Sequence, residues 1–430
     1  MPLPDGSPVP TTEGLSTRRR SPARRRSPTA RPSPTARRSA ERDHPSSGAT
    51  AAGVSAASTL QRVSGTLAGM DPSLLLSRTV LQAPMAGGPS TPELAAAVSG
   101  AGGLGFLAGG YRTVDELRSD IRRTRSLTPA PFGVNLFVPT VATADPEALR
   151  SYLERLRPEA DRLGVGWDVG QAMSTGSRSP SVGGGDGTDS WDGKVDMLLS
   201  EGVDLASFTF GPPSPSLVQR FHDSGATVVA TVTTVDEAVR AQVSGADALC
   251  VQAVEAGGHQ GSFIEPDRCR TEPLPALLTA VRQATSVPLI AAGGLPAEAA
   301  AVREALDRGA SAVSLGTAFL LTPECGAHAA YKAALTSGRF ASTRPTRAFS
   351  GRWARALENR FVIDHSPVAP TGYPVLNRLT APLRRAAADR SDWESMALWA
   401  GTGFRSAQAV PAAAVTATLL SQLGHRTSAG

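Results

Sequence analysis

The chain has 430 residues and a formal net charge of +5 at pH 7, from 43 Lys and Arg against 38 Asp and Glu. Residues 1–45 hold ten Arg and four acidic residues, which leaves 33 basic and 34 acidic residues, a net charge of −1, in the remainder. The basic balance therefore belongs to the first segment and does not indicate that the rest of the chain binds nucleic acid. The irregular spacing of the three cysteines argues against a disulfide framework and against a zinc site; they are Cys250, Cys269 and Cys325.

Residues 1–70 form an Arg/Ser/Pro-rich tail that we expect to be disordered. Runs such as TRRRSPARRRSPTARPS contain no large apolar side chain, so burial cannot offset the entropy lost on folding. Its arginines either bind nucleic acid or anionic lipid, or the tail is a dispensable extension, which we favour. No apolar stretch of roughly 7 to 15 residues follows the Arg runs as an export signal requires, and no run of about 18 apolar residues predicts a membrane span. We expect a soluble, cytoplasmic protein with no membrane or nucleic-acid partner.

From residue 79 to residue 319, short apolar runs alternate with helical patterns. The helical patterns begin with capping residues, as at Thr91 before Pro92 and in the capping box of Thr113 and Glu116. Eight strands and about eight helices predict an α/β fold, a (β/α)8 TIM barrel over residues 71–338. A doubly wound open sheet is the weaker alternative, because no GxGxxG motif follows a first strand. The predicted strands are residues 79–85, 104–109, 132–138, 204–211, 227–233, 248–254, 288–294 and 312–319.

Two segments do not follow this alternation. Residues 165–193 are rich in Gly and Ser and predict a flexible insertion between the third helix and the fourth strand. Residues 339–430 predict a mainly helical C-terminal segment. Because this segment holds Trp353, Trp393 and Trp399, we expect it to pack on the barrel.

Residues that follow the strands are the candidate site residues, because chemistry in a TIM barrel takes place at the C-terminal strand ends. Glycines after the seventh and eighth strands leave backbone N–H groups free to hold a phosphate, although tight turns alone also explain them. Asn135 and Gln252 are inward-facing amides that bond either to a ligand or to neighbouring backbone. The apolar run Ala83, Pro84 and Met85 after the first strand suits a flat heterocycle. The candidate phosphate site comprises Gly293, Gly294, Gly316 and Thr317.

The stretch VEAGGHQGSF, residues 254–263, places a histidine between glycines. Gly257, Gly258 and Gly261 would let the loop pass close over a planar cofactor. A neutral imidazole with a pKa near ~6.5 can accept a proton near neutral pH, so His259 is a candidate base. A lone histidine in such a loop is more often structural, and the other strand ends are what favour a catalytic role here.

Six segments, in this order, resemble the nitronate monooxygenase family, formerly called 2-nitropropane dioxygenases: LQAPMAGG, GVNLFVP, FTFGPP, GADALCVQAVEAGGHQGSF, PLIAAGGL and GASAVSLGTAFLLTPE. The resemblance covers about residues 76–338 and continues in YPVLNRLTAPLRRAA and WAGTGFRSAQA. It implies an FMN-dependent enzyme that oxidises alkyl nitronates with O2 to nitrite and a carbonyl compound, without a nicotinamide and without a metal. The small-molecule nitronate and O2 are then its partners, and we expect a monomer or homodimer.

The resemblance also implies roles for individual residues. His259 matches the family's catalytic histidine, which is taken as the base toward neutral nitroalkanes. Ala83, Pro84 and Met85 would line the flavin ring, and Asn135 and Gln252 would bond to it. The ribityl chain and phosphate would be surrounded by Gly257, Gly258, Gly293, Gly294, Gly316 and Thr317.

One part of such a site is missing from the sequence pattern. A reduced flavin is stabilised by positive charge near its ring, yet the predicted strand ends contain no Lys or Arg. Only Arg112 lies just beyond the second strand.

Other functions stay open beside this one. An FMN-dependent NAD(P)H reductase of enoyl-acyl-carrier or quinone type looks similar in the barrel and in the Gly-Gly-His loop, but the Trp-rich C-terminal segment favours the monooxygenase. A dehydrogenase of the inosine-monophosphate type needs a loop cysteine, and Cys269 lacks the small-residue context of that motif. A non-catalytic flavin or nucleic-acid binder would have no need of a titratable group such as His259.

Overall fold

The computed structural model describes residues 78–140, 144–175 and 189–424. The expected tail, residues 1–70, lies outside the described residues, as do residues 176–188 of the expected insertion. In the described ranges, no helix is both long and apolar enough to cross a membrane.

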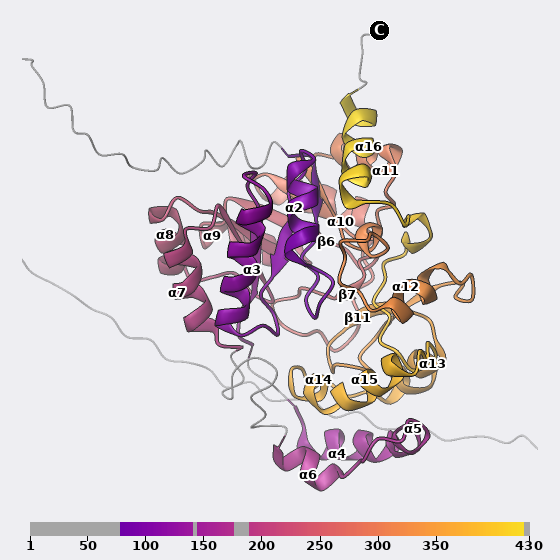
Figure 1. Cartoon of the computed structure of the whole chain (residues 1–430). Coiled ribbons are helices and arrows are strands. Elements are labelled where there is room, and N and C mark those ends of the chain that lie inside the picture. Colours follow the sequence, from indigo (N-terminus) through magenta and orange to yellow (C-terminus); the bar gives the residue numbers. More distant parts are fainter. Residues whose placement is uncertain (1–77, 141–143, 176–188, 425–430) are drawn as a thin grey trace, which may run out of the picture. The chain divides into compact units, whose positions relative to one another are not determined.

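A parallel sheet of eight strands lies at the centre of the described fold (Figure 1). Its spatial order is β1-β9-β8-β6-β5-β4-β3-β2. Hydrogen bonds from Gln82 N to Leu104 O (2.9 Å) and from Leu104 N to Val80 O (3.0 Å) join β1 to the residues before β2 and close the sheet into a barrel. The predicted TIM barrel is confirmed. The strands are β1 (Val80–Gln82), β2 (Phe106–Ala108), β3 (Gly133–Phe137), β4 (Leu205–Thr209), β5 (Thr227–Val232), β6 (Ala248–Gln252), β8 (Leu289–Ala292) and β9 (Ala312–Leu315).

Every strand is shorter than its predicted run. The predictions extended into residues that have already left the sheet, such as Gly293 and the 3-10 turn η1 (Thr317–Phe319). Apolar side chains continue from the strands into these loops, so hydrophobic pattern alone does not mark where a strand ends. The excess residues are those that surround the mouth of the barrel.

The barrel interior is filled by side chains from nearly every strand, including Leu81, Leu205, Val229 and Ile290. Phe106 occupies the space beside Gly133, where a Cβ would overlap the phenyl ring. The interior is therefore a packed core rather than a pore.

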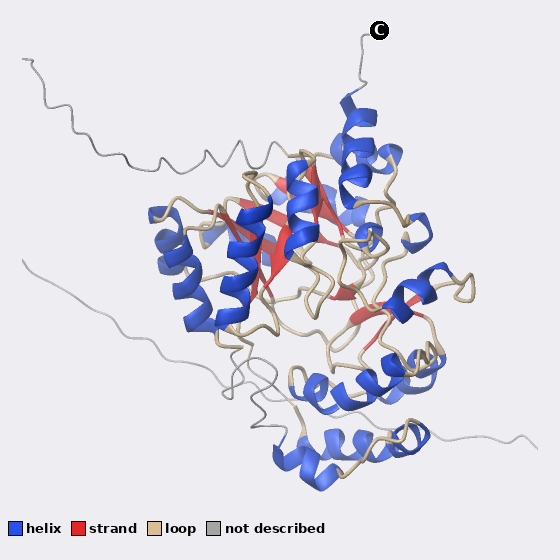
Figure 2. Cartoon of the chain, viewed as in Figure 1, coloured by secondary structure: helices blue, strands red, loops and turns tan. Residues whose placement is uncertain are grey.

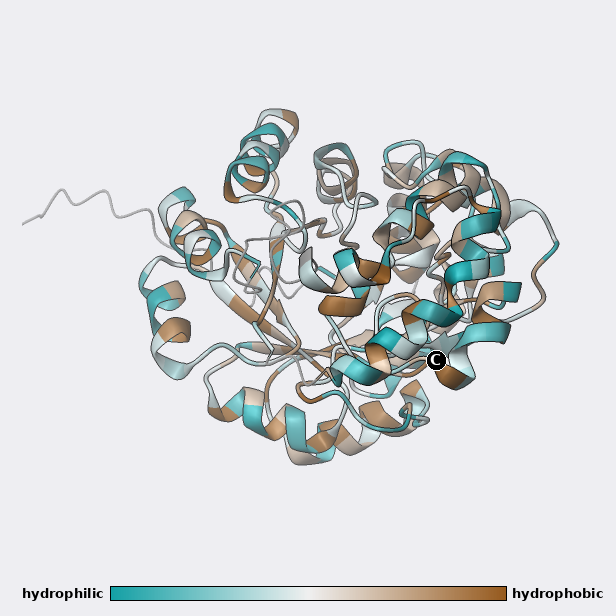
Figure 3. Cartoon of the chain, turned by 90° about the horizontal axis from the view of Figure 1, so that it is seen from below, coloured by the Kyte–Doolittle hydropathy of each residue, from teal (hydrophilic) through white to brown (hydrophobic). Residues whose placement is uncertain are grey.

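Helices cover the outside of the sheet (Figure 2). In the view of Figure 3 they combine hydrophobic and hydrophilic residues, as expected for helices with one buried face; in α8, for example, Leu217, Val218 and Phe221 are buried. The outer helices are α2 (Pro92–Gly100), α3 (Val114–Leu127), α7 (Trp191–Glu201), α8 (Pro215–Asp223), α9 (Val235–Val243), α10 (Leu274–Ala284), α11 (Ala299–Asp307) and α16 (Ala412–Gly424).

Two of these helices differ from those expected. The chain's last helix, α16, packs against α2, α11 and β1 and so completes the outer layer after β9, whereas we expected the barrel to be complete by residue 338. The third outer helix is α7, which contacts β3 and α3. From the sequence, the helical pattern DPEALRSYLERLRPEADRLG at residues 145–164 had been expected to form this third helix. That pattern forms α4 (Pro146–Arg155) and α5 (Arg157–Arg162), followed by α6 (Val169–Thr175). An amphipathic helix has the same periodicity whichever surface it packs on, so the sequence could not separate these cases.

Helices α4 and α5 pack on residues that follow the barrel. Because α16 belongs to the outer layer of the barrel, the name C-terminal segment is used from here on for residues 339–411 only. The Tyr152 hydroxyl donates to Ala348 O at 2.8 Å, and Leu149 and Leu153 share a hydrophobic cluster with Phe361. The other elements after β9 are α12 (Ala329–Thr336), β10 (Thr343–Thr346), β11 (Ala354–Leu357), α13 (Arg360–His365), η2 (Ser366–Val368), α14 (Val375–Leu379), α15 (Ala381–Asp389) and η3 (Phe404–Ser406).

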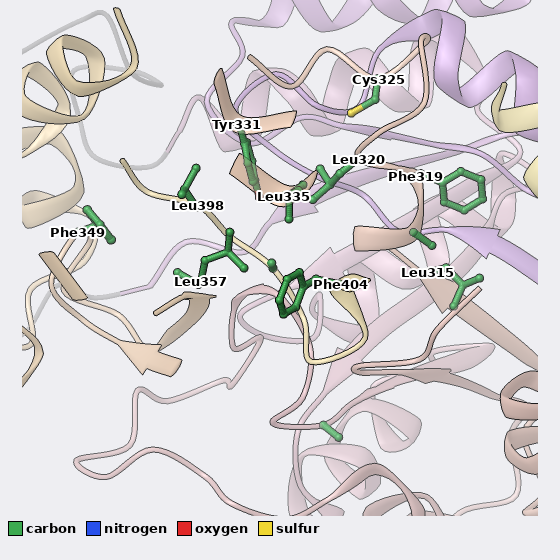
Figure 4. Packing of buried hydrophobic residues seen from close by; sticks show 14 of the residues in the cluster. Leu315, Phe319, Leu320, Cys325, Tyr331, Leu335, Phe349, Leu357, Leu398 and Phe404 are labelled. Atoms are coloured by element: carbon green, nitrogen blue, oxygen red, sulfur yellow. The ribbon is translucent and has the colours of Figure 1, made fainter. Parts of the chain in front are cut away.

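The C-terminal segment also packs against the end of the barrel. Figure 4 shows this cluster, in which the labelled side chains come from both parts of the chain. The residues that follow from β9 onward are Leu315, Phe319, Leu320, Cys325, Tyr331 and Leu335, and those of the C-terminal segment are Phe349, Leu357, Leu398 and Phe404.

Glu159 on α5 links that helix to the C-terminal segment. Its carboxylate accepts hydrogen bonds from Arg360 at 2.5 and 2.8 Å and from Arg162 at 3.0 Å. Burial alone would raise the pKa of Glu159, but the hydrogen bonds from Arg360 and Arg162, with His365 nearby at 3.7 Å, outweigh it and hold this pKa well below its usual range.

We expect Glu159→Gln to lower the free energy of unfolding at pH 7 by about 1 kcal/mol, because it removes the buried carboxylate that Arg360 and Arg162 share. The loss is limited because Arg360 still pairs with Asp364 and Arg162 with Asp392.

The matched control is Glu154→Gln, whose bond to Arg157 is exposed to solvent, so its loss should change the stability much less. Because folding lowers the pKa of Glu159, the difference between wild type and variant should be largest above pH ~4.3 and disappear as the pH falls well below it. Urea unfolding at several pH values measures this, and equal effects of the two variants would contradict it.

Candidate active site

One cavity of about 610 Å³ lies at the C-terminal ends of the strands. All twelve residues selected from the sequence line it, and the C-terminal segment supplies further lining residues, among them Asn377, Arg384 and Trp399. No Asp or Glu side chain lies among the described residues that line the cavity. The twelve are Ala83, Pro84, Met85, Asn135, Gln252, Gly257, Gly258, His259, Gly293, Gly294, Gly316 and Thr317.

The loop that carries His259 is held by the C-terminal segment. Gly258 and His259 form a two-residue strand, β7, that pairs antiparallel with Ala354 and Arg355 of β11. The ladder continues with a hydrogen bond of 2.8 Å from Gln260 N to Trp353 O. A loop of glycines would otherwise have few conformational restraints, so this pairing fixes where the imidazole lies.

Gln252 supports the same loop from the barrel side. Its amide nitrogen donates to His259 O at 3.1 Å, and its oxygen accepts from Gly261 N at 2.7 Å. Asn135 donates to Ser207 Oγ at 2.9 Å and to Thr209 Oγ1 at 3.1 Å. Both amides therefore bond to protein, which is the structural alternative left open by the sequence, while they also border the cavity.

Two of the glycines are required by packing against the C-terminal segment. A Cβ at Gly257 would lie 2.5 Å from Gly401 N. At Gly294, φ is +64° and a Cβ would lie 2.5 Å from Glu255 Cβ and overlap Thr402 Oγ1. Close approach of backbone explains Gly257, and the positive φ with the side chains of Thr402 and Glu255 explains Gly294. Contact of either glycine with a ligand is a separate proposal.

Aromatic rings surround His259. The ring centroids of Tyr373 and Trp399 lie 5.3 and 5.4 Å from that of the imidazole, and Phe210 lies at 6.3 Å. The hydroxyl groups of Tyr373 and Tyr111 are 3.0 Å apart. These aromatic residues were not selected from the sequence, because they come from separate strand ends and from the distant C-terminal segment.

The surroundings keep His259 neutral. Burial, with smaller contributions from the positive charges of Arg352 and Arg384, lowers the pKa of His259 to about 3. This value lies well below the ordinary pKa near ~6.5 that the sequence alone suggested. The Ser350 hydroxyl donates to Arg352 O at 3.2 Å, so His259 Nε2 donates to Ser350 Oγ at 2.8 Å and leaves Nδ1 as the proton-accepting nitrogen.

The positive charge missing from the strand ends comes from elsewhere. Arg112 does not line the cavity and pairs with Asp120 at 3.4 Å. Arg384 on α15 does line the cavity. Arg352 is buried over the ring of Phe210, 3.9 Å from its centroid. The run LRRAA carries Arg384, but only the folded chain shows that this arginine reaches the barrel mouth.

The described residues contain no group of three or more His, Cys, Asp or Glu arranged to hold a metal ion. The three cysteines carry no disulfide. Burial raises the pKa of Cys250, the one cysteine that lines the cavity, to about 12, so its thiol is not a ready nucleophile at neutral pH.

Comparison with known proteins decides the family. The nitronate monooxygenase family model matches residues 73–422. The chain belongs to the nitronate monooxygenase family. The family is one of flavoenzymes, so the chain is an oxidoreductase, and the predictions of family and enzyme class are confirmed.

The alignments with relatives in this family span nearly the whole length of each relative. The nitronate monooxygenase of Pseudomonas aeruginosa is 39% identical over 81% of this chain and 97% of its own length. A probable nitronate monooxygenase of Bacillus subtilis is 34% identical over 77% and 91%. Among solved structures, nitroalkane oxidase from Streptomyces ansochromogenes has 42% identity and a TM-score of 0.72 over 81% of this chain and 96% of its own. FabK from Thermotoga maritima has 25% identity and a TM-score of 0.61 over 82% and 94%.

We expect the His259 imidazole to stay neutral from pH 8 to pH 5, because its pKa is lowered so far. NMR of protein labelled with ¹³C in its six histidines follows each ring, and the signal absent from His259→Asn identifies this one. The signal should keep its position over that range. A midpoint near pH ~6.5 for the same signal would contradict the electrostatic account.

Proposed function

We propose that this nitronate monooxygenase uses bound FMN to oxidise alkyl nitronates with O2, releasing nitrite and a carbonyl compound. The reaction balances when two nitronates share one O2: each carbon–nitrogen bond breaks, each carbon gains one oxygen atom of O2, and each nitrogen leaves with its own two oxygens as nitrite. The observation that carries the proposal is that all twelve residues selected for such a site line one cavity.

The cavity suits a flavin. The apolar run Ala83, Pro84 and Met85 offers a flat surface beside Gly316, where a Cβ would still be 3.5 Å from Ala83 Cβ. At Gly258 a Cβ would meet no protein atom within 4 Å, so the backbone there is open to a ligand. We assign Gly293, Gly294, Gly316 and Thr317 to the ribityl and phosphate, with Asn135, Gln252 and Gly257 beside the ring system. When bound, the flavin supplies the electron transfer from the nitronate to O2.

The remaining surfaces suit a small anion with an alkyl group. A cavity of about 610 Å³ that also holds a flavin leaves space only for a short substrate. Phe210, Tyr373 and Trp399 exclude water from the side where His259 lies. Because the imidazole is neutral, it can orient a nitronate without repelling or protonating it, and Nδ1 can take the α-proton of a neutral nitroalkane.

A direct test distinguishes the proposed monooxygenase from the alternative, a flavin-dependent NAD(P)H reductase. We expect anaerobic ethyl nitronate to bleach the flavin of the purified protein far faster than NADH at the same concentration. Flavin released by heating should migrate as FMN in chromatography, since only one phosphate site is assigned. Faster bleaching by NADH would favour a reductase, and released FAD would contradict the cofactor assignment.

A further inference from the structure

Arg384 is the charged group in the cavity that the proposed function has not used. It lies on α15, where Nη2 donates to Asn377 O at 2.5 Å. Its buried Nε has no acceptor among the described residues, and within the same residues no carboxylate lies within ion-pair distance of the guanidinium. An arginine so enclosed ordinarily pairs with an anion, because an uncompensated buried charge is costly.

The surroundings of Arg384 place its charge at the reacting end of the cavity. Burial lowers the pKa of Arg384, while electrostatic interaction with Tyr111 and Tyr373 raises it. Arg384 also acts electrostatically on His259. The glycines assigned to the phosphate have other neighbours: Gly294 packs on Glu255 and Thr402. Arg384 therefore acts on the end of the cavity that holds His259 and the two tyrosines.

We propose that Arg384 binds the two oxygens of the substrate's nitronate group and so selects the anionic substrate. This inference rests on the proposed function for the identity of the substrate. The planar, forked guanidinium matches a planar group with two oxygens that share one negative charge. The neighbouring hydroxyls of Tyr111 and Tyr373 can donate to the same oxygens, and no acidic side chain among the described lining residues opposes the anion.

Inorganic nitrate is a suitable probe, because it is a planar oxyanion that the enzyme cannot oxidise further. Calorimetric titration of the flavin-loaded protein with sodium nitrate, with sodium chloride at equal ionic strength as reference, measures the anion site without turnover. We expect Arg384→Gln to raise the Kd of nitrate about 10- to 100-fold, the usual effect of losing a charged hydrogen bond. Arg384→Lys, which keeps the charge but not the fork, should lie between wild type and Arg384→Gln.

Arg385 provides the matched control. It is the next residue on the same helix, is exposed and does not line the cavity, so Arg385→Gln removes the same charge without touching the site. Its nitrate Kd should equal that of the wild type. In turnover, Arg384→Gln should raise the KM for ethyl nitronate by a similar factor and leave the KM for neutral nitroethane nearly unchanged.

The outcomes separate the two proposals. Wild-type protein that binds nitrate through Arg384 but does not oxidise nitronate contradicts the proposed function and supports the anion site. Equal nitrate affinity in wild type and Arg384→Gln, or no nitrate binding by the wild type, overturns the role of Arg384. Loss of flavin from both Arg384→Gln and Arg384→Lys also overturns it, because the arginine would then hold the cofactor.

Discussion

The pairing of β7 with β11 is the contact on which the site depends. Gly258 and His259 belong to a loop of the barrel, yet their ladder partners, Ala354 and Arg355, come from the C-terminal segment. The side chain of Arg355 adds a hydrogen bond of 2.7 Å to Val254 O. Gln252 holds the same loop from the barrel side, so the barrel and the C-terminal segment together fix the imidazole. The C-terminal segment is therefore part of the proposed site rather than an accessory to it.

The same contact determines the electrostatics. The pairing holds the C-terminal segment over the barrel mouth. His259 is therefore surrounded by aromatic rings, and Arg352 and Arg384 lie close enough to lower its pKa. Burial and these cations disfavour the imidazolium, while a lining that has no acidic side chain among the described residues favours an anionic ligand. One arrangement thus gives both a neutral histidine and an arginine, Arg384, that has no carboxylate partner in the described part of the chain. Together they suit a substrate that arrives already deprotonated.

Much of the barrel could be predicted from the sequence, and the parts that could not have physical reasons. The capping box of Thr113 and Glu116 is local and is present as predicted. The twelve candidate residues follow strands whose ends must meet, so their common cavity could be anticipated. The placement of α16, of α4 and of Arg384 depends on contacts between residues that are far apart in the sequence. The periodicity of hydrophobic residues carries no information on such contacts. The lowered pKa of His259 could not be predicted either, because it depends on which residues surround the imidazole. The close backbone packing at Gly257 could not be predicted because a glycine motif has the same sequence whether it packs against protein or against a ligand.

In the proposed mechanism, His259 is a neutral group that a nitroalkane needs as a base and that a nitronate, already deprotonated, does not. The most direct test is anaerobic, single-turnover reduction of the flavin in wild type and His259→Asn, with ethyl nitronate and with nitroethane. The account predicts that the variant retains its flavin, loses about 10² to 10⁴-fold in rate with nitroethane and loses a much smaller factor with the nitronate. Equal losses with the two substrates, with flavin retained, would contradict it.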